Sequence, residues 1–464
     1  MNGIPGIVQV IAERISTIGG TALLVGGSVR DQLLNRPIKD IDIEVYHLPD
    51  WGILKSVLSD LGSLNEVGQS FAVLKLTTSE YEVDLSFPRL DSKIDKGHRG
   101  FEVQYDPNLS FSIAASRRDF TINSMGFNPL TKEFFDPFHG KEDLDHDCLR
   151  HIGSAFVEDP LRVLRAAQFA ARFELSIAAL TISLCQTMPI NELPRERIFE
   201  ELKKLLLKSK RPSCGLTYFK ALGIFNLLPE LAAMENTEQD PEYHPEGNVW
   251  IHTMMVIDEM ATLSLALPED QRLSLMLAAL CHDLGKPATT DRVDGRIRAF
   301  GHDLAGVSQT KQFLARITQD KRLIDKVLPL VKFHLRPAQL YHSHLTQSVS
   351  DGAIRRLSIQ VSIPELLLLA KADHLGRLSP DALQRQFPAG EWLSERAKHL
   401  TVFSEQPSPL LTGKHLLTLG VKPGPHMGAL LKQAFDYQIE HGFSDLDEAI
   451  AFVRKSLLDL FTHR

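Results

Sequence analysis

The stretch LLVGGSVRDQLLNRPIKDIDIEVY, residues 23–46, decides the fold of the N-terminal part of the chain. It opens with an aliphatic run, passes through the pair Gly26–Gly27, continues with apolar residues at helical spacing, and ends in an alternating run. Glycine permits a tight turn because it has no Cβ atom. The stretch therefore predicts a strand, a glycine turn, a helix and a second strand, in that order.

Two aspartates open the second predicted strand. Asp40 and Asp42 are two residues apart, so both side chains face the same way. Two carboxylates on one face suit Mg²⁺, which can hold a triphosphate and activate an attacking hydroxyl. Asp84, in the run YEVDLSF, could complete the cluster from the next strand. A surface strand with two aspartates is common by itself, so the prediction depends on the glycine turn before it.

The glycine turn predicts a phosphate site beside these carboxylates. The following helix is expected to start near Ser28, where its free N–H groups would point toward a triphosphate. Gly26 and Gly27 let the backbone approach a ligand closely. Arg30 adds a guanidinium that can bind phosphate. These residues predict a site for nucleotidyl transfer.

The order of these motifs resembles the head of polymerase-β-like nucleotidyltransferases, specifically the class II bacterial tRNA nucleotidyltransferase and poly(A) polymerase family, of the CCA-adding type. The segment SRRDFTINSMGFN at 116–128 looks like the second motif of that family. By that match, Arg118 would contact the nucleotide and Asp119 the ribose 2′-hydroxyl. Taken alone, the RRD sequence could also form a salt-bridged turn. The resemblance implies Mg²⁺ as cofactor, ATP and CTP as substrates, and tRNA as the partner.

The segment EDPLRVLRAAQFAARF at 158–173 predicts how the base is chosen. On one helix, Asp159 and Arg162 would share a face, and one accepts hydrogen bonds while the other donates them. Cytosine and adenine each present an amino donor beside a ring-nitrogen acceptor, whereas uracil and guanine mismatch this pair. Glu158 could brace Arg162. In isolation the same pattern is typical of an ordinary helix with ion pairs.

The resemblance makes this segment the amino-acid template for C and A. It also implies that Arg165 contacts the nucleotide, while Gln168 stands where the family has a further arginine. ERIFEEL at 196–202 resembles the last motif and is expected to be structural. VGQSFAVLKL at 67–76 looks like the CCA-adding pattern, and the residues between Asp84 and Arg117 leave room for the loop used when switching from C to A. An enzyme that adds only A remains open.

A second constellation follows in helical, histidine-rich sequence. CHDLGK at 281–286 resembles the signature of the HD metal-dependent phosphohydrolases. Imidazole and carboxylate ligands suit a divalent metal such as Mg²⁺, Mn²⁺, Ni²⁺ or Co²⁺, and a metal-bound hydroxide can attack a phosphate ester. A lone histidine would be core or surface, but here six residues occur in family order, enough for two ions bridged by Asp283. The predicted ligands are His252, His282, Asp283, His302, His334 and Asp373.

Composition and periodicity divide the 464 residues into four regions. We expect an α+β fold, in which a polymerase-β-like head with a small mixed sheet precedes all-α neck, HD and tail domains. The polar stretch at 235–247 is interpreted as a linker, and the tail could pack on the HD domain or grip tRNA. The expected domains are a nucleotidyltransferase head at 1–150, a helical neck at 151–235, an HD domain at 236–385 and a tail at 386–464.

Charge, cysteines and hydropathy limit the remaining classes. The net charge of −7 does not by itself indicate nucleic acid, and no run is long enough to span a membrane. Four scattered cysteines fit a reducing, cytoplasmic location. Two other classes stay open: a signalling nucleotidyltransferase–phosphohydrolase, and a non-catalytic RNA-binding scaffold. The EDxxR and RRDFTIN segments disfavour the first, and the intact aspartates disfavour the second. Nothing in the sequence sets an oligomeric state.

Overall fold

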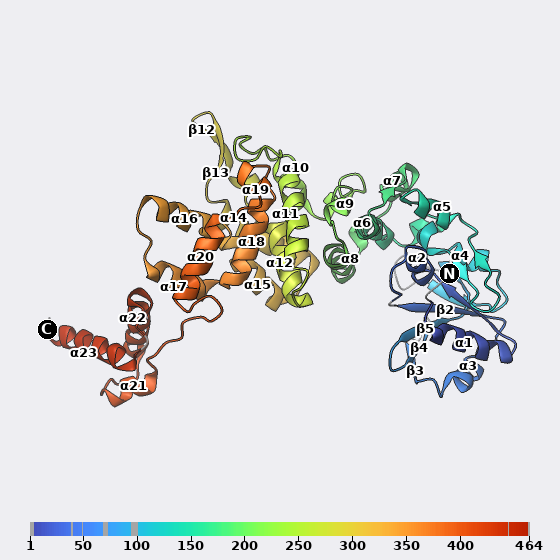
Figure 1. Cartoon of the computed structure of the whole chain (residues 1–464), viewed down its shortest axis with the longest axis horizontal. Helices are drawn as coiled ribbons and strands as arrows, with labels where there is room; N and C mark the ends of the chain where they lie inside the picture. Colours follow the sequence, from blue (N-terminus) through green and yellow to red (C-terminus); the bar gives the residue numbers. More distant parts are fainter. Residues whose placement is uncertain are drawn as a thin grey trace. The chain divides into compact units, whose positions relative to one another are not determined.

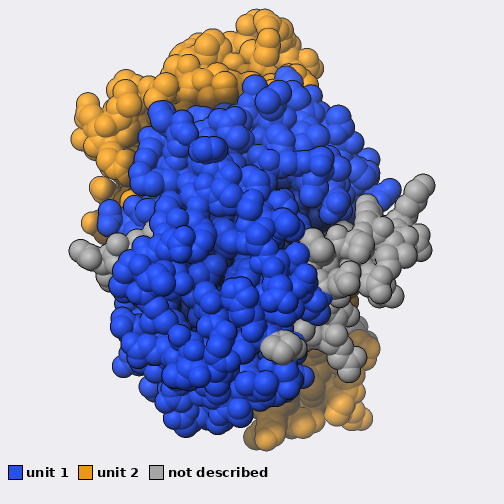
Figure 2. Space-filling model, turned by 90° about the vertical axis from the view of Figure 1, so that its right-hand side faces the viewer, with its two compact units in different colours: residues 1–205, 214–227 blue, residues 206–213, 228–464 orange. Residues whose placement is uncertain are grey.

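The computed structural model describes residues 4–38, 40–48, 50–67, 73–93, 101–443 and 445–462. These residues form two compact units, residues 1–205 with 214–227 and residues 206–213 with 228–464 (Figures 1 and 2). The segments 67–76 and 85–116, which carry the predictions on tail specificity, lie partly outside the described residues. None of the described helices is long and apolar enough to cross a membrane.

The first unit contains a sheet in the order β3-β4-β5-β2-β1-β8-β9. Its central strands are β1 (Thr21–Val25), β2 (Ile41–Tyr46) and β5 (Glu82–Ser86). β1 and β2 are mostly buried, as their aliphatic sequences predict, whereas in β5 only Val83 and Leu85 are buried. β2 pairs parallel with β5 and antiparallel with β1. The other strands are β3 (Ser63–Val67), β4 (Val73–Thr77), β8 (Gly126–Phe127) and β9 (Phe134–Phe135).

Helices cover this sheet and continue into the neck. The amphipathic helix α1 (Gly6–Thr17) packs on β1 through its buried aliphatic face and contacts α3 (Trp51–Leu58) (Figure 1). The turn after β1 leads into α2 (Gly27–Leu33). Further along, α4 (Phe111–Ala115) ends just before Arg118 and Asp119, α6 (Leu161–Phe173) carries Arg162 and Arg165, and α8 (Arg195–Lys208) carries Arg197.

The second unit is a helical domain built around α12 (Glu269–Cys281). Nine consecutive residues at the end of α12 are buried, and the helix packs against α11 (Val249–Leu263), α15 (Lys321–Phe333) and α18 (Ile363–Leu375). A helix that is apolar all round belongs at the centre of a domain. α14 (His302–Ile317) packs on α15. The predicted fold class is confirmed, although the structure adds one hairpin to the helical part.

This hairpin joins β12 (Thr290–Val293) to β13 (Arg296–Ala299). Its turn, Asp294–Gly295, has positive φ at both residues, 53° and 75°. An Asp-Gly pair favours this turn because both positions need left-handed backbone. The strands are only four residues long and have no buried residue, so the brief alternation in Arg296–Ala299 is a weak signal in the sequence.

The polar stretch 235–247, predicted to be a linker, folds onto this domain instead. Thr237 and Gln239 are buried, and Gln239 Nε2 donates to the Gly247 carbonyl over 3.1 Å. Ion pairs tie Glu238 to Arg292 and Glu242 to Arg296 on the hairpin. The stretch is polar because it forms one wall of a pocket, and not because it is solvated on all sides.

The C-terminal tail has its own small core. Leu411, Leu416, Leu430 and Val453 are buried together among α21 (Gly413–Thr418), α22 (Pro425–His441) and α23 (Leu446–Thr462). α22 packs against α17 (Asp351–Gln360), where Arg355 donates to the Ile439 carbonyl over 3.1 Å. Of the two predicted roles for the tail, these contacts favour packing.

Candidate nucleotidyl-transfer site and metal centre

The three predicted carboxylates of the head lie on or just before two neighbouring interior strands of the sheet, β2 and β5. The parallel register of β2 and β5 places Asp42 directly opposite Asp84, so their side chains share a face. Asp40 is exposed and comes just before β2. Burial, with the negative charges of Asp84 and Asp40, raises the pKa of Asp42 to about 6 against the opposing effect of Arg118. A divalent cation would relieve this repulsion.

A serine hydroxyl fixes the glycine turn against these carboxylates. Ser28 Oγ donates to the Asp40 carbonyl over 2.8 Å and accepts from the Asp42 N–H over 3.2 Å. Gly26 has φ of +68°, and a Cβ atom there would lie 3.0 Å from Arg118 Nη1. Glycine is therefore needed at position 26, and the N-terminus of α2, which begins at Gly27, is held beside the aspartates. Contact of Gly26 and Gly27 with a triphosphate stays a prediction.

Arg30 is 4% exposed and belongs to a buried network. Its Nε and Nη2 donate to Asp31 Oδ1 over 2.8 and 2.7 Å, and its Nη1 donates to Asn123 Oδ1. The guanidinium also lies 4.2 Å from the ring centre of Phe173. These contacts support a role in positioning Asn123, and a direct contact between Arg30 and phosphate stays a prediction.

The same network continues to the predicted ribose-binding residue. Asp119 Oδ1 accepts from Asn123 Nδ2 over 2.9 Å and from the Phe120 N–H over 2.8 Å. Its Oδ2 accepts from Arg165 Nε over 2.7 Å. Burial alone would raise the pKa of Asp119, but the charge of Arg165 and these hydrogen bonds lower it. Asp119 is therefore an ionised acceptor, as the prediction for the 2′-hydroxyl requires.

Arg118 is held near Asp42 by Glu44, the second carboxylate on β2. Its Nη2 lies 3.5 Å from Glu44 Oε1, and its Nη1 donates to the Asn123 carbonyl over 3.1 Å. Glu44 is buried and accepts from the Tyr46 hydroxyl over 2.7 Å. The arginine thus lies beside Asp42, where a nucleotide phosphate would be expected.

Asp159 does not lie on the same helix as Arg162, so this part of the template prediction is wrong. α6 begins at Leu161, and Asp159 has extended backbone with φ of −121°. Pro160 explains the difference, because a residue before proline is disfavoured in helical backbone. Asp159 is instead fixed by Arg197, whose Nη1 and Nη2 donate to its two oxygens over 3.3 and 3.0 Å.

Backbone carbonyls hold Arg162 near Asp159. Its Nη1 donates to the Ala155 carbonyl over 2.7 Å and its Nη2 to the Arg117 carbonyl over 2.6 Å. These carbonyls provide the bracing that was predicted for Glu158, whose own role stays a prediction. Gln168, in the place of a family arginine, is buried on α6 and its Nε2 has no hydrogen-bond partner among the described residues.

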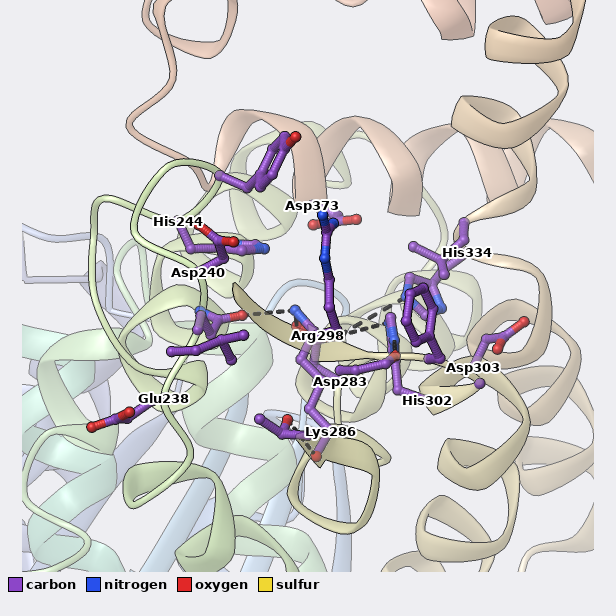
Figure 3. A pocket seen from close by; sticks show the side chains of 18 of the residues that line it. Glu238, Asp240, His244, Asp283, Lys286, Arg298, His302, Asp303, His334 and Asp373 are labelled. Carbon is purple, nitrogen blue, oxygen red and sulfur yellow. Dashed lines mark hydrogen bonds and ion pairs between the residues drawn. The ribbon is translucent and has the colours of Figure 1, made fainter. Parts of the chain in front are cut away.

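The second unit brings the six predicted metal ligands together in two adjoining groups, His252 with His282 and Asp373, and Asp283 with His302 and His334. Figure 3 labels four of them, Asp283, His302, His334 and Asp373. The nitrogen atoms surround Asp283: His282 Nε2 lies 3.2 Å from its Oδ2, and His302 Nε2 lies 3.4 Å from its Oδ1. His334 Nε2 is 4.0 Å from the same Oδ1. On the other side, His252 Nε2 is 3.1 Å from Asp373 Oδ1. Asp283 therefore lies between two groups of ligands.

Hydrogen bonds set the tautomer of three of these histidines. The Nδ1 atoms of His282, His302 and His334 lie 2.8, 2.7 and 2.6 Å from the carbonyls of residues 279, 299 and 331. A carbonyl only accepts, so Nδ1 carries the proton and Nε2 presents a lone pair. All three Nε2 atoms are buried without a hydrogen-bond partner. Burial lowers the pKa of His334 to about 4, which keeps it neutral and able to ligate.

Nearby cations and a further carboxylate complete the cage. Burial alone would raise the pKa of Asp283, but without a metal ion the positive charges of protonated His282 and of Lys286, whose Nζ is 2.7 Å away, hold it well below the usual range. Arg377 likewise donates to Asp373 over 2.9 Å. His252 differs from the other histidines because its Nδ1 lies 2.9 Å from the buried carboxylate of Glu246.

Close helix packing explains the glycine of the HDLG sequence. A Cβ atom on Gly285 would lie 2.0 Å from the His302 carbonyl and 2.6 Å from the Gly306 nitrogen. Only glycine lets the end of α12 approach α14 so closely, and this approach brings Asp283 and His302 together. The resulting cage opens to a pocket of about 360 Å³.

Comparisons with known proteins match the two parts of the chain that carry these sites. The family model for the poly A polymerase head domain matches residues 22–150, and the model for the HD domain matches residues 249–378. The multifunctional CCA protein of Laribacter hongkongensis is 33% identical over 76% of this chain and 84% of its own length. That of Stenotrophomonas maltophilia K279a is 33% identical over 89% and 97%, respectively. The chain belongs to the bacterial tRNA nucleotidyltransferase and poly(A) polymerase family.

Solved structures share the fold of this nucleotidyltransferase family member. The Bacillus stearothermophilus CCA-adding enzyme in complex with CTP aligns with a TM-score of 0.61 at 19% identity, covering 98% of each chain. The Thermotoga maritima CCA-adding enzyme complexed with tRNA aligns with a TM-score of 0.59 at 19% identity, covering 97% of this chain and 95% of that one.

Several residues that contact the side chains of these two sites were not predicted. Arg197 lies in the ERIFEEL segment, but an arginine on an amphipathic helix gives no sign of its partner. Glu246 lies in the polar stretch interpreted as a linker. Arg377 follows Asp373 by one helical turn, and that i,i+4 spacing was a usable signal.

Proposed function

We propose that this protein adds C, C and A to the 3′ end of tRNA, using CTP and ATP. The observation that carries the proposal is the parallel register that sets Asp42 opposite Asp84, beside the glycine turn and Arg118. Relatives named multifunctional CCA proteins support the reaction class. The proposed domains are a head at 1–150, a neck at 151–235, an HD domain at 236–385 and a tail at 386–464. A tRNA substrate suits a cytoplasmic location.

The chemistry assigns distinct roles to the residues of the head. Asp40, Asp42 and Asp84 would hold Mg²⁺, which when bound activates the tRNA 3′-hydroxyl and stabilises charge on the triphosphate. Gly26, Gly27, Arg30, Arg118 and Arg165 would orient the triphosphate and sugar, with the ribose 2′-hydroxyl donating to Asp119. The 3′-oxygen attacks the α-phosphate in line, and pyrophosphate leaves with the bonding electron pair.

Base selection would depend on a carboxylate beside a guanidinium. Asp159 can accept from the amino group of cytosine or adenine, and Arg162 can donate to the adjacent ring nitrogen. Two features support this role: Arg197 fixes the carboxylate, and backbone carbonyls fix the guanidinium. Uracil and guanine present a carbonyl and an N–H in these places, so each would leave both charged groups unpaired.

Three tRNA transcripts test this function: one lacking CCA, one ending in C and one ending in CC. Each is incubated with Mg²⁺ and CTP, ATP, UTP and GTP, first separately and then together. Ordered addition of C, C and A that then stops is the expected result. Addition of A to the CC-ending transcript alone would identify a specialised A-adding enzyme, and UTP used as readily as CTP would contradict the template role of Asp159 and Arg162.

We also propose that the HD site hydrolyses phosphate esters, such as 2′,3′-cyclic phosphates or 2′-nucleotides. The three buried, lone-pair-bearing Nε2 atoms around Asp283 support it, because they have no hydrogen-bond partner and suit a divalent ion. Mg²⁺, Mn²⁺, Ni²⁺ and Co²⁺ are the candidate ions. Asp283→Ala should remove both the bound metal and the hydrolysis, with nucleotide addition intact. Hydrolysis at the wild-type rate in that variant would reject the assignment.

A further inference from the structure

The pocket beside the HD ligands has one wall that the metal chemistry does not use. The hairpin β12–β13 and the residues after it contribute Arg298 and Phe300 to the lining, and the stretch 235–247 contributes Tyr243. The Glu238–Arg292 and Glu242–Arg296 ion pairs described above hold this stretch to the hairpin. Figure 3 shows Arg298 together with the labelled ligands around the same pocket.

Phe300 is the most unusual side chain of this wall. It is 73% exposed, although it lines the pocket and lies only two residues before the ligand His302. A single exposed ring is ordinary on a protein surface, but its place at the mouth of a charged pocket is not. Gly301, with φ of +73°, makes the turn between this ring and the first residue of α14. A flat group in the pocket could therefore stack on Phe300 while its phosphate reaches the ligands.

Arg298 adds a charge without a protein partner. Among the described residues, its side chain makes no hydrogen bond and no ion pair, whereas Lys286 and Arg377 are both engaged with the ligand carboxylates. A free guanidinium in a pocket is suited to a phosphate oxygen or to the face of a base. The pocket volume of about 360 Å³ is in the range that holds a single small ligand.

We propose that this wall, formed by Phe300, Arg298 and Tyr243, binds the base and one phosphate oxygen of a nucleotide ester that the HD site hydrolyses. Phe300 stacks on the base, the exposed ring of Tyr243 offers a second aromatic contact, and Arg298 holds a phosphate oxygen that points away from the ligands. The inference rests on the proposed phosphohydrolase function. It goes beyond that function because it assigns recognition of the base to residues outside the metal cage.

Steady-state hydrolysis by the Ni²⁺-loaded protein tests this assignment with two esters. Adenosine 2′,3′-cyclic phosphate carries a base, and glycerol 2-phosphate does not. Phe300→Leu should raise KM for the nucleotide at least about fivefold, since a base stacked on an aromatic ring gains about 1–3 kcal/mol. Phe300→Leu should leave KM for glycerol 2-phosphate within about twofold. Phe300→Tyr, which keeps an aromatic ring, should have the wild-type KM for the nucleotide. Arg298→Gln should raise KM for both esters.

Leu304→Ala is the matched control, because Leu304 is 62% exposed nearby on α14 and does not line the pocket. Equal KM for the nucleotide in wild type and Phe300→Leu, or equal increases for both esters, would overturn the inference. If the wild-type protein hydrolyses neither ester, the proposed phosphohydrolase function fails separately. Calorimetric titration of the Ni²⁺-loaded protein with adenosine 2′-monophosphate then decides the inference: weaker binding by Phe300→Leu supports it, and unchanged or absent binding overturns it.

Discussion

The two candidate metal sites of this chain are built in opposite ways. In the head, Asp40 is exposed and the side chain of Asp84, on an interior strand of the sheet, is 43% exposed. In the HD domain, the side chains of Asp283 and His282 are 2% and 1% exposed. An open carboxylate cluster suits an ion that arrives with a triphosphate, whereas a closed cage suits an ion that stays bound. The contrast separates a site completed by its substrate from a site completed by folding.

The sites also differ in how far their supporting contacts reach along the sequence. Histidines in the cage are oriented by carbonyls three residues away, as with His282 and Ala279. In the first unit, Asp119 of the head depends on Arg165, 46 residues away, and Asp159 of the neck depends on Arg197, 38 residues away. Local support survives in any correctly formed helix, but distant support exists only when the segments that carry the two partners are packed together.

The largest expected effect is the loss of one activity while the other is kept. Asp42→Ala should lower the rate of nucleotide addition about 10⁴-fold, because removing a principal catalytic group typically costs this much. Hydrolysis by the HD site should stay within about twofold, since the two sites share no residue. Addition to a CC-ending tRNA and hydrolysis of a nucleotide ester are measured on the same preparation. Parallel loss of both activities would contradict independent sites.

Metal removal should affect stability in the second unit alone. At an ion concentration 1,000 times its Kd, bound metal stabilises the folded state by about 4 kcal/mol. Chelation with EDTA should therefore lower the unfolding temperature of the second unit, measured by calorimetry, and leave that of the first unit unchanged. Asp283→Ala should abolish the EDTA effect, whereas Asp303→Ala, which lines the pocket without belonging to the cage, should retain it. An equal shift in both units would contradict the proposed resident ion.

The dependence of the template on distant support is tested at Arg197. Arg197→Met should free Asp159 and reduce the preference for CTP over UTP about 10- to 100-fold, because a mobile carboxylate no longer rejects the uracil carbonyl. Arg195→Met, on an exposed position of the same helix, is the matched control. Single-nucleotide incorporation gives kcat/KM for each base. Unchanged selectivity with a lower rate for both bases would assign Arg197 a purely structural role.

The smallest effect concerns pH. Asp42 has a pKa of about 6 without metal, so below that pH an incoming ion must displace a proton. The affinity of the head for Mn²⁺ should fall about tenfold per pH unit below pH 6 and level off above it. Arg118→Gln should move this transition to higher pH, because the positive charge of Arg118 lowers the Asp42 pKa. Mn²⁺ binding is followed by electron paramagnetic resonance in an Asp283→Ala background. An Mn²⁺ affinity that is constant from pH 5 to pH 7 would contradict the raised pKa of Asp42.

The sequence predicted the chemical groups of both sites better than the contacts that hold these groups in place. The spacing of Asp40 and Asp42, and the order of the six HD residues, depend on short-range rules of strand and helix geometry. The placement of Asp159 on a helix was wrong because Pro160 interrupts the helical backbone. The hairpin β12–β13 was missed because each strand has only four residues and none is buried, and only the Asp294–Gly295 pair gave a clear signal of its turn.

By itself, the sequence determined the α+β head, the helical second half and which side chains carry the chemistry. These follow from local periodicity and from residue types whose charge and ligand preferences are fixed. Tertiary structure alone decided that Asp42 faces Asp84, that Arg197 fixes Asp159, and that the stretch 235–247 forms the wall of a pocket. Such pairings join residues far apart in the chain, and they form only when burial of the shared core compensates for the entropy lost in bringing them together.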